Sequence, residues 1–201
     1  MAHTVITIAR QYGSGGKTVG RMLSEDLGIH FYNREILRLA SDASGISEEI
    51  FGANDEVIKK SILQRIAKKI NIGDVLPPDS DDFLSTTNLF NYQAKVIRQL
   101  AETESCVIVG RCADYILRDK ADCLKVFIHA SMEYRADRIV REYGERAETP
   151  EQRLKDKDKR RAAYHRFYTD MKWGHSQNYH ITLDSGVLGI DKCGDIIKQL
   201  Y

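Results

Sequence analysis

The sequence predicts an α/β fold in which a parallel β-sheet is covered by helices on both faces. Three observations support this prediction. Short apolar runs alternate with helical patterns along the chain. The runs at 105–109 and 124–128 are largely apolar, with consecutive hydrophobic residues at 106–109 and 126–128, as in strands buried on both faces. A strand with one face in water would alternate between apolar and polar residues. A glycine-rich turn separates the first run from the first helix, and ligands of parallel sheets bind beyond the carboxyl ends of strands.

The turn after the first strand has the chemistry of a phosphate-binding loop. The apolar strand 5–8 leads into a glycine-rich segment, and Lys17 and Thr18 then begin a helix. Backbone N–H groups of such a turn converge on an anion, and the positive end of the helix dipole adds to the attraction. Lysine supplies a cation for the β- and γ-phosphates, and the threonine hydroxyl can ligate Mg²⁺. This combination indicates a nucleotide-dependent phosphotransferase.

The loop departs from the pattern G-x-x-x-x-G-K-[ST] because Gln11 occupies the position of its first glycine. Three nearby glycines supply the flexibility that this position needs. An ordinary glycine-rich turn is the alternative, but the order of strand, loop, Lys-Thr and helix favours the phosphate loop. We therefore predict that the donor nucleotide is bound by Gly13, Ser14, Gly15, Gly16, Lys17 and Thr18, with Thr18 as the metal ligand.

The next segments complete a β-α-β unit. Val19, Leu23 and Leu27 share one helix face, and Gly28 is placed to end this helix. A short extended run follows at 29–32, and we expect Asn33 to cap a helix over residues 34–43.

Residues 44–85 have no strand character and predict a helical insertion beside the sheet. A turn at 44–47 precedes a helix start at Glu48, and a basic helix is expected at 57–70. Pro77 and Pro78 lie in an acidic loop. On composition alone, this segment is either a solvent-exposed surface insertion or a part that binds substrate.

The second half of the chain continues the alternation. Helical patterns are expected at 88–101, 132–143 and 189–200, and strands at 105–109, 124–128 and 180–183. Arg10, Asn33 and Arg111 each follow a strand, which places all three at the ligand-binding edge of the sheet.

The densest charge lies between residues 144 and 172. A mixed run of charges is usually the solvated face of a helix. Tyr164, Phe167 and Tyr168 recur at helical spacing, which favours packing over a platform for stacking bases.

Length, net charge, apolar runs and cysteine positions limit the kinds of protein that this sequence can encode. A chain of 201 residues with a net charge of +1 is expected to form a single domain, 1–201, with no general affinity for nucleic acid or anionic membranes. No apolar run is long enough to span a bilayer, and the N-terminus enters a strand without a signal-type segment. The four cysteines are far apart and form no C-x-x-C pair, and two of them lie within or beside apolar strand runs. This pattern indicates buried thiols, not disulfides or a zinc site, in a cytoplasmic protein. The sequence leaves open whether it is a monomer or a homodimer.

Several stretches together resemble the cytidylate kinase-like group of the P-loop nucleoside monophosphate kinases. The motifs are Ile8-Ala-Arg-Gln-Tyr-Gly-Ser-Gly-Gly-Lys-Thr18, Gly28-Ile-His-Phe-Tyr-Asn-Arg-Glu-Ile-Leu37, Cys106-Val-Ile-Val-Gly-Arg-Cys-Ala-Asp-Tyr-Ile-Leu117, Phe127-Ile-His-Ala-Ser131 and Asn178-Tyr-His-Ile-Thr-Leu-Asp-Ser185. The resemblance implies five parallel strands in the order 2-3-1-4-5, an acceptor-binding helical part at 44–100 and a lid at 144–172. It also implies ATP as phosphoryl donor, Mg²⁺, and a pyrimidine monophosphate such as CMP as acceptor.

The resemblance further implies roles for individual residues. Lys17, Arg111, Arg160 and Arg161 would be catalytic. The acceptor would be bound by Asn33, Arg34, Arg111, Asp114 and Asp158, with Asp114 orienting Arg111 or the nucleoside.

Three departures from the family pattern bear on specificity. Gln11 replaces a glycine, Cys112 stands where cytidylate kinases carry Asp, and Asn33 stands where relatives commonly have Asp. A kinase of another small molecule and a nucleotide-binding regulatory protein with little turnover therefore remain alternatives.

Overall fold

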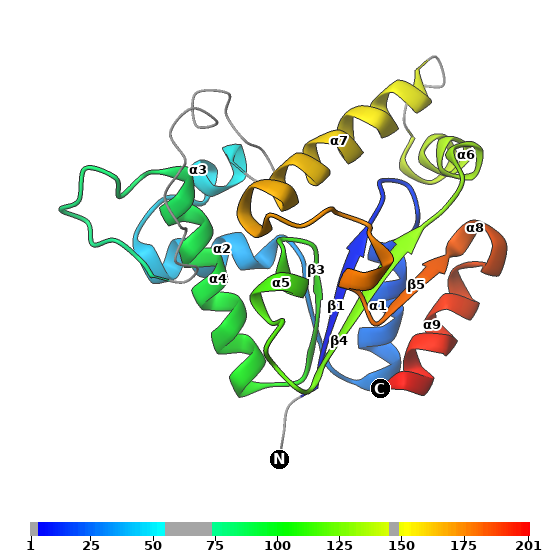
Figure 1. Cartoon of the computed structure of the whole chain (residues 1–201), viewed down its shortest axis with the longest axis horizontal. Helices are drawn as coiled ribbons and strands as arrows, with labels where there is room; N and C mark the ends of the chain where they lie inside the picture. The colour runs from blue at the N-terminus through cyan, green and yellow to red at the C-terminus, as the bar shows by residue number, and fades with distance from the viewer. Residues whose placement is uncertain (1–3, 55–73, 145–148) are drawn as a thin grey trace.

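The computed structural model describes residues 4–54, 74–144 and 149–201. Its five strands form one parallel sheet in the order β2-β3-β1-β4-β5 (Figure 1). The strands are β1 (Val5–Arg10), β2 (His30–Tyr32), β3 (Cys106–Val109), β4 (Cys123–His129) and β5 (Ile181–Asp184). β1 lies at the centre, with Val5 opposite both Cys106 of β3 and Cys123 of β4. The expected strand order is confirmed.

Helices cover both faces of this sheet (Figure 1). They are α1 (Gly16–Leu27), α2 (Glu35–Ser44), α3 (Glu48–Ala53), α4 (Thr86–Thr103), α5 (Ala113–Ile116), α6 (Met132–Tyr143), α7 (Pro150–Thr169), α8 (Ser185–Leu188) and α9 (Ile190–Leu200), with a 3₁₀ turn at Ser176–Asn178. α1 and α9 pack together on one face of the sheet, and α2, α4 and α5 cover the other (Figure 1).

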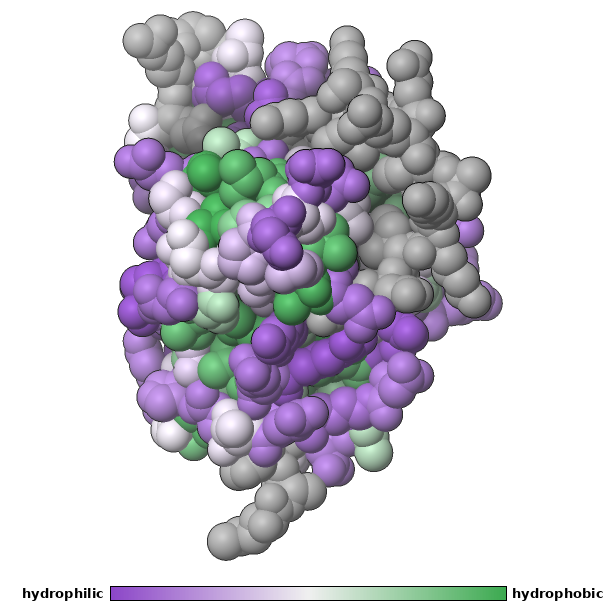
Figure 2. Space-filling model, turned by 90° about the vertical axis from the view of Figure 1, so that its left-hand side faces the viewer, coloured by the Kyte–Doolittle hydropathy of each residue, from purple (hydrophilic) through white to green (hydrophobic). Residues whose placement is uncertain are grey.

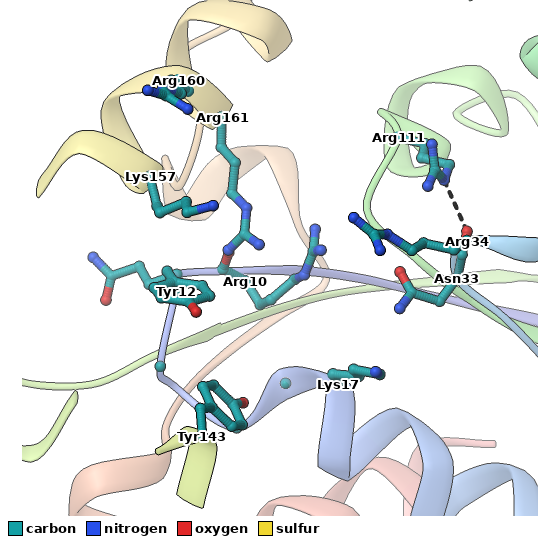
Figure 3. A pocket seen from close by; sticks show the side chains of 14 residues that line it. Arg10, Tyr12, Lys17, Asn33, Arg34, Arg111, Tyr143, Lys157, Arg160 and Arg161 are labelled. Atoms are coloured by element: carbon teal, nitrogen blue, oxygen red, sulfur yellow. Dashed lines mark hydrogen bonds between the residues drawn. The ribbon is translucent and has the colours of Figure 1, made fainter. Parts of the chain in front are cut away.

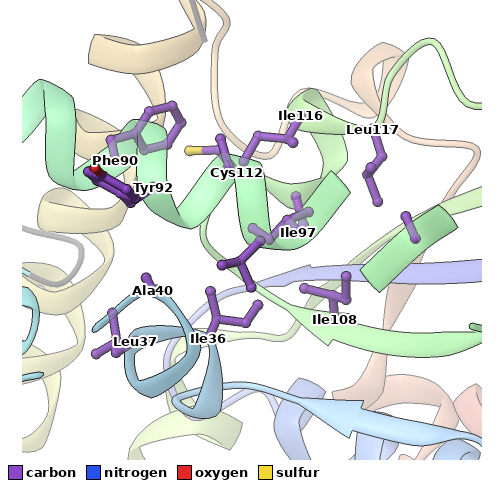
Figure 4. Packing of buried hydrophobic residues seen from close by; sticks show 14 of the residues in the cluster. Ile36, Leu37, Ala40, Phe90, Tyr92, Ile97, Ile108, Cys112, Ile116 and Leu117 are labelled. Atoms are coloured by element: carbon purple, nitrogen blue, oxygen red, sulfur yellow. The ribbon is translucent and has the colours of Figure 1, made fainter. Parts of the chain in front are cut away.

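The core therefore has two layers, and β3 shows why its sequence is uniformly apolar. Cys106 and Ile108 point into the layer beneath α2 and α4, whereas Val107 and Val109 point into the layer beneath α1 and α9. Figure 4 shows Ile108 in the first layer together with Ile36, Ile97 and Ile116, which come from α2, α4 and α5. Because both faces are covered, every position of the strand is buried.

Local structure agrees with most expected boundaries. Gly28 ends α1 in the left-handed conformation, with φ of 63°. The expected cap at Asn33 is wrong: α2 begins at Glu35, Arg34 occupies the cap position, and no side chain caps the helix. The backbone oxygen of Asn33 instead accepts a hydrogen bond from Arg111 Nε at 2.8 Å. α5 and α8 were not expected, because four residues are too few to establish a helical period.

The expected basic helix at 57–70 lies outside the described residues. The proline-rich loop is present, and its Leu76 and Leu84 are exposed. Figure 2 views the side of the molecule on which this loop lies, and apolar side chains there are interspersed with hydrophilic ones. None of the helices in the described ranges is long and apolar enough to cross a membrane. All four cysteines are buried free thiols, as expected.

Candidate active site

A pocket of about 430 Å³ lies at the carboxyl ends of the strands (Figure 3). Its lining residues are Arg10, Gln11, Tyr12, Gly13, Gly15, Gly16, Lys17, Asn33, Arg34, Arg111, Tyr143, Lys157, Arg160 and Arg161. Seven of these residues are arginine or lysine, and none of the described lining residues is Asp or Glu. Cations concentrated in this way on a concave surface attract and hold polyanions such as nucleotide phosphates.

The glycine-rich loop forms the floor of the pocket. Gly13 and Gly15 have φ of 80° and 78°, a region in which other residues are strained. A Cβ on Gly13 would also lie 2.9 Å from Ile139 Cγ2 and 3.0 Å from the backbone oxygen of Arg135. Glycine is therefore required at this position both for conformation and for packing against α6.

Of the six residues expected to bind the donor, four line the pocket: Gly13, Gly15, Gly16 and Lys17. Ser14 has a different role, because its buried hydroxyl lies 2.9 Å from the Gln11 oxygen and 3.1 Å from the Ile128 oxygen, and it fixes the loop from beneath. The Thr18 hydroxyl accepts a hydrogen bond from Arg138 Nη2 at 3.0 Å.

Gln11 has a structural use that explains its presence in the loop. Its backbone N–H donates to the Ile128 oxygen at 3.0 Å, and its side-chain oxygen accepts from the Ala130 N–H at 3.2 Å. These two bonds fasten the start of the loop to the end of β4. A glycine at this position would lose the second bond.

Arg111 and Asn33 lie together on the opposite side of the pocket from Tyr12 (Figure 3). Arg111 is 4% exposed, and its guanidinium donates to the Asn33 backbone oxygen and, at 3.2 Å, to Gln93 Oε1. Arg34 follows Asn33 and lines the same side. The structure thus brings these three predicted acceptor residues into one pocket.

The turn that carries Arg111 has an unusual backbone. Gly110, Arg111 and Cys112 have consecutive φ values of 81°, 58° and 55°. The left-handed conformation costs a residue other than glycine about 1–3 kcal/mol, and such strain is retained mainly where surrounding contacts hold it, often at functional sites. Here the Gly110 N–H donates to the Ile8 oxygen at 3.0 Å, and the buried Arg111 side chain is bonded on two sides.

Helix α7 supplies the third wall of the pocket, with Lys157, Arg160 and Arg161 (Figure 3). Arg161 Nη1 donates to the Arg10 oxygen at 3.3 Å, and its guanidinium lies 5.5 Å from the centre of the Tyr12 ring. Arg160 is exposed on the adjacent face. Arg160 and Arg161 therefore both reach the pocket from one helix.

Asp158 lies against the loop instead of the open pocket. Its carboxylate accepts from the Tyr12 N–H at 2.7 Å and from Arg135 Nη1 at 2.5 Å. Arg135 is itself buried and also donates to the Tyr12 oxygen at 3.1 Å and the Ala130 oxygen at 3.1 Å. Asp158 and Arg135 thus join α7, α6 and the loop.

Asp114 is also buried, and its Oδ2 lies 3.0 Å from His165 Nε2 on α7. It borders a smaller cavity of about 20 Å³, which Arg111 and Arg161 also line, and it does not line the main pocket.

Sequence reasoning missed Arg135 and Arg138 on α6. Both are buried, and Arg138 Nε has no hydrogen-bond partner in the described part of the chain. A signal was available: the two arginines are three residues apart and share a face, and Arg138 directly precedes the buried Ile139, on a helix that starts just beyond β4. Buried guanidinium groups on such a helix indicate anion binding or a structural ion pair.

The model of the cytidylate kinase-like family matches residues 5–187. Among solved structures, an uncharacterized protein from Eubacterium ventriosum ATCC 27560 is 27% identical, with a TM-score of 0.72 over 98% of both chains. A shikimate kinase from Acinetobacter baumannii in complex with shikimate is 18% identical, with a TM-score of 0.51 over 98% of this chain and 92% of that chain. A shikimate kinase from Bacteroides thetaiotaomicron is 12% identical, with a TM-score of 0.54 over 98% and 97%. No curated protein sequence matches the chain.

Proposed function

Because the chain belongs to the cytidylate kinase-like family, we propose that it transfers the terminal phosphoryl group of ATP to a nucleoside monophosphate, with CMP or a related pyrimidine nucleotide as the first candidate. One observation carries this proposal. A phosphate loop with Lys17, the strand-end Arg111 and the lid residue Arg161 face a single pocket whose described lining contains no carboxylate. Cations converging from three directions suit two phosphate-bearing ligands held end to end.

The loop supports binding of the donor phosphates. Gly15 and Gly16 line the pocket, and the exposed Lys17 provides a mobile cation at the start of α1. Lys17 then stabilises the charge that develops on the β- and γ-phosphates.

The fit to Mg²⁺ is weaker than the sequence motif implies. The Thr18 hydroxyl faces the Arg138 guanidinium, which would repel a second cation at the same oxygen. Among the described residues, no group of three or more His, Cys, Asp or Glu side chains could hold a metal ion. We therefore treat Mg²⁺ as part of the donor substrate and assign no step to Thr18.

On the acceptor side, Arg111 is the residue that we propose binds the acceptor phosphate, with Arg34 and Asn33 beside it. A phosphate acceptor needs no strong general base, so catalysis consists of alignment and charge neutralisation. Arg160 and Arg161 contribute charge from the lid, which also excludes water as a competing acceptor.

The second candidate is a kinase of another anionic small molecule. The residues around the expected acceptor position support this candidate. Asp158, which the family resemblance assigns to the acceptor, is bonded to Tyr12 and Arg135. Arg10, Arg34 and Arg111 can hold an acidic group but do not discriminate a base. The concentration of cations argues against a regulatory protein without turnover.

A coupled assay of ADP release separates these candidates. Purified protein is supplied with MgATP and, in turn, each nucleoside monophosphate and a panel of phosphorylated or carboxylated small molecules. Turnover that is fastest with CMP or UMP supports the first candidate, and turnover confined to other anions supports the second. Absence of acceptor-dependent ADP release with the whole panel, from protein that binds ATP, contradicts both.

A further inference from the structure

Helix α7 has a polar inner face that contacts the site at three points. Asp158, Arg161 and His165 are spaced so that they share one side of the helix. Asp158 contacts the phosphate loop, Arg161 contacts the end of β1, and His165 contacts Asp114 of α5. Figure 1 shows α7 running past the carboxyl ends of the strands, from the side of α6 toward α4.

The contact between His165 and Asp114 is the most enclosed of the three. The two side chains are 4% and 6% exposed, and the distance from His165 Nε2 to Asp114 Oδ2 is 3.0 Å. The other ring nitrogen lies 3.1 Å from Thr169 Oγ1, so the imidazole is oriented from both edges. Polar groups buried to this extent are destabilising unless they are paired, and here each satisfies the other.

This bond joins two elements that carry phosphate-binding arginines. Asp114 lies in the first turn of α5, three residues after Arg111 and two residues after the end of the backbone with positive φ at 110–112. His165 lies one helical turn after Arg161 on α7. Arg111 and Arg161 also border the small cavity beside the pair.

We propose that Asp114 and His165 form a positioning pair that fixes the spacing between Arg111 and Arg161. The pair holds the C-terminal part of α7 against the turn at 110–112. This contact keeps the acceptor phosphate in line with the phosphoryl group that is transferred. Neither side chain lines the main pocket, so the pair acts through the two arginines. This inference rests on the proposed phosphoryl transfer.

The test compares variants on the same helix. His165→Leu removes the donor to Asp114, and His165→Gln keeps an N–H donor near the position of Nε2. Thr169→Val removes the hydroxyl that orients the imidazole and that also bonds the His165 backbone oxygen and the Met171 N–H. It keeps the imidazole itself, and so provides a milder variant if His165→Leu folds poorly. The matched control is Tyr168→Phe, which removes the bond from the Tyr168 hydroxyl to the Thr86 oxygen at 3.0 Å and so loosens the same end of α7 from α4.

We expect His165→Leu to lower kcat by about 10- to 100-fold, because misplacement by about 1 Å can have this effect. KM for ATP and for the acceptor that the ADP-release panel identifies should change by less than about threefold, since ground-state contacts remain. His165→Gln should restore most of the rate. The kcat of Thr169→Val should lie between those of His165→Leu and His165→Gln. Tyr168→Phe should lower Tm without lowering kcat. Equal losses in the Leu and Gln variants, or wild-type kcat in both His165→Leu and Thr169→Val, would overturn the proposal.

Hydrogen exchange on the same variants tests the pair independently of turnover. His165→Leu, or Thr169→Val to a smaller extent, should speed exchange both at 110–117 and at 158–169, because one bond holds both segments. Faster exchange in α7 alone would overturn the proposal. If the wild-type protein transfers no phosphoryl group, the proposed function fails, while the exchange data still decide whether the pair links the two segments.

Discussion

At the scale of single residues, Arg111 combines an unfavourable backbone with a buried cation. Its φ is 58°, and its guanidinium is held by the Asn33 oxygen and Gln93 Oε1. Packing requires neither feature, because a glycine would suit the turn and an apolar side chain would suit the burial. The proposed binding of an acceptor phosphate would account for the buried cation and for the backbone that carries it.

Arg111→Lys tests this role. Lysine keeps the charge but loses the planar fork that binds a phosphate through two hydrogen bonds. We expect kcat/KM for the acceptor to fall by at least about tenfold, while KM for ATP changes little. Steady-state kinetics with varied acceptor and saturating ATP provide the measurement. Unchanged kinetics in both substrates would assign Arg111 to structure alone.

Lys17→Met tests the donor side. The side chain is exposed at the start of α1, so its replacement should not change Tm. We expect kcat to fall by roughly 100- to 1,000-fold, as for loss of a charge contact to the transition state. Arg21→Met, one turn further along α1 and also exposed, is the matched control and should retain the wild-type rate. A folded Lys17→Met protein with near-normal kcat would contradict the phosphate-loop assignment.

The location of a residue in the pocket was predictable where the residue belongs to a motif or directly follows a strand. Lys17, Asn33, Arg34 and Arg111 meet one of these conditions, and all line the pocket. Arg138 meets neither, because its position depends on how α6 packs against the loop. The partner of Asp114 was equally inaccessible, since His165 is 51 residues away in the chain.

At the scale of elements, α7 shows the limit of pattern reading. Its charges suggest a solvated helix, yet Asp158, Arg161 and His165 all turn inward and find polar partners. Hydrophobic periodicity cannot reveal a buried face that is itself polar. The aromatic residues at its end do follow the expected packing, as Tyr168 stacks on Phe90 with ring centres 3.8 Å apart.

Asp158→Asn tests whether α7 is fastened to α6 and the loop. The change leaves the buried Arg135 guanidinium without its carboxylate, and we expect a loss of about 3 kcal/mol in the free energy of unfolding. Lys155→Ala on the same helix is the control, because its pair with Glu151 is exposed and should contribute less than about 0.5 kcal/mol. Urea unfolding of the three proteins gives the values. Equal stability of Asp158→Asn and wild type would show that the α7 contacts do not hold the fold.

At the scale of the whole molecule, the sheet was the most predictable feature. The side-chain contacts that hold its edge strand β2 were the least predictable. Apolar runs predicted the strands β1, β3 and β4, because burial on both faces leaves a strong pattern. The edge strands β2 and β5 were expected only as short extended segments, and they are less buried. The edge strand β2 is held differently. His30 pairs with Glu104, and the Tyr32 hydroxyl donates to Glu104 Oε1 at 2.7 Å, which ties β2 to the residue that follows α4.

This edge predicts a pH dependence of stability. The hydrogen bond to Glu104 raises the pKa of His30 above its ordinary value of 6.5. The pair therefore contributes fully below pH 6.5, and its contribution is lost as pH rises through the raised pKa of the folded protein. The ring is exposed, so we expect an effect on Tm of only about 2 °C. His30→Gln should remove this pH dependence, and Tm measured from pH 5 to 9 in both proteins checks it. A wild-type profile that is unchanged in the variant would exclude this pair as its source.

The central place of β1 has a consequence for how the chain acquires its structure during synthesis. β1 pairs with β3 and β4, and β2 pairs with β3, so neither early strand finds a sheet partner until residue 106 has been made. Until then the apolar residues of β1 have no strand to pair with, and such unpaired strands are prone to aggregation. The loop that follows β1 takes its final shape only after Ile128 and Ala130 emerge, because its bonds to both residues fasten it. The phosphate loop, although synthesised well before β4, can therefore bind a nucleotide only after β4 has been made.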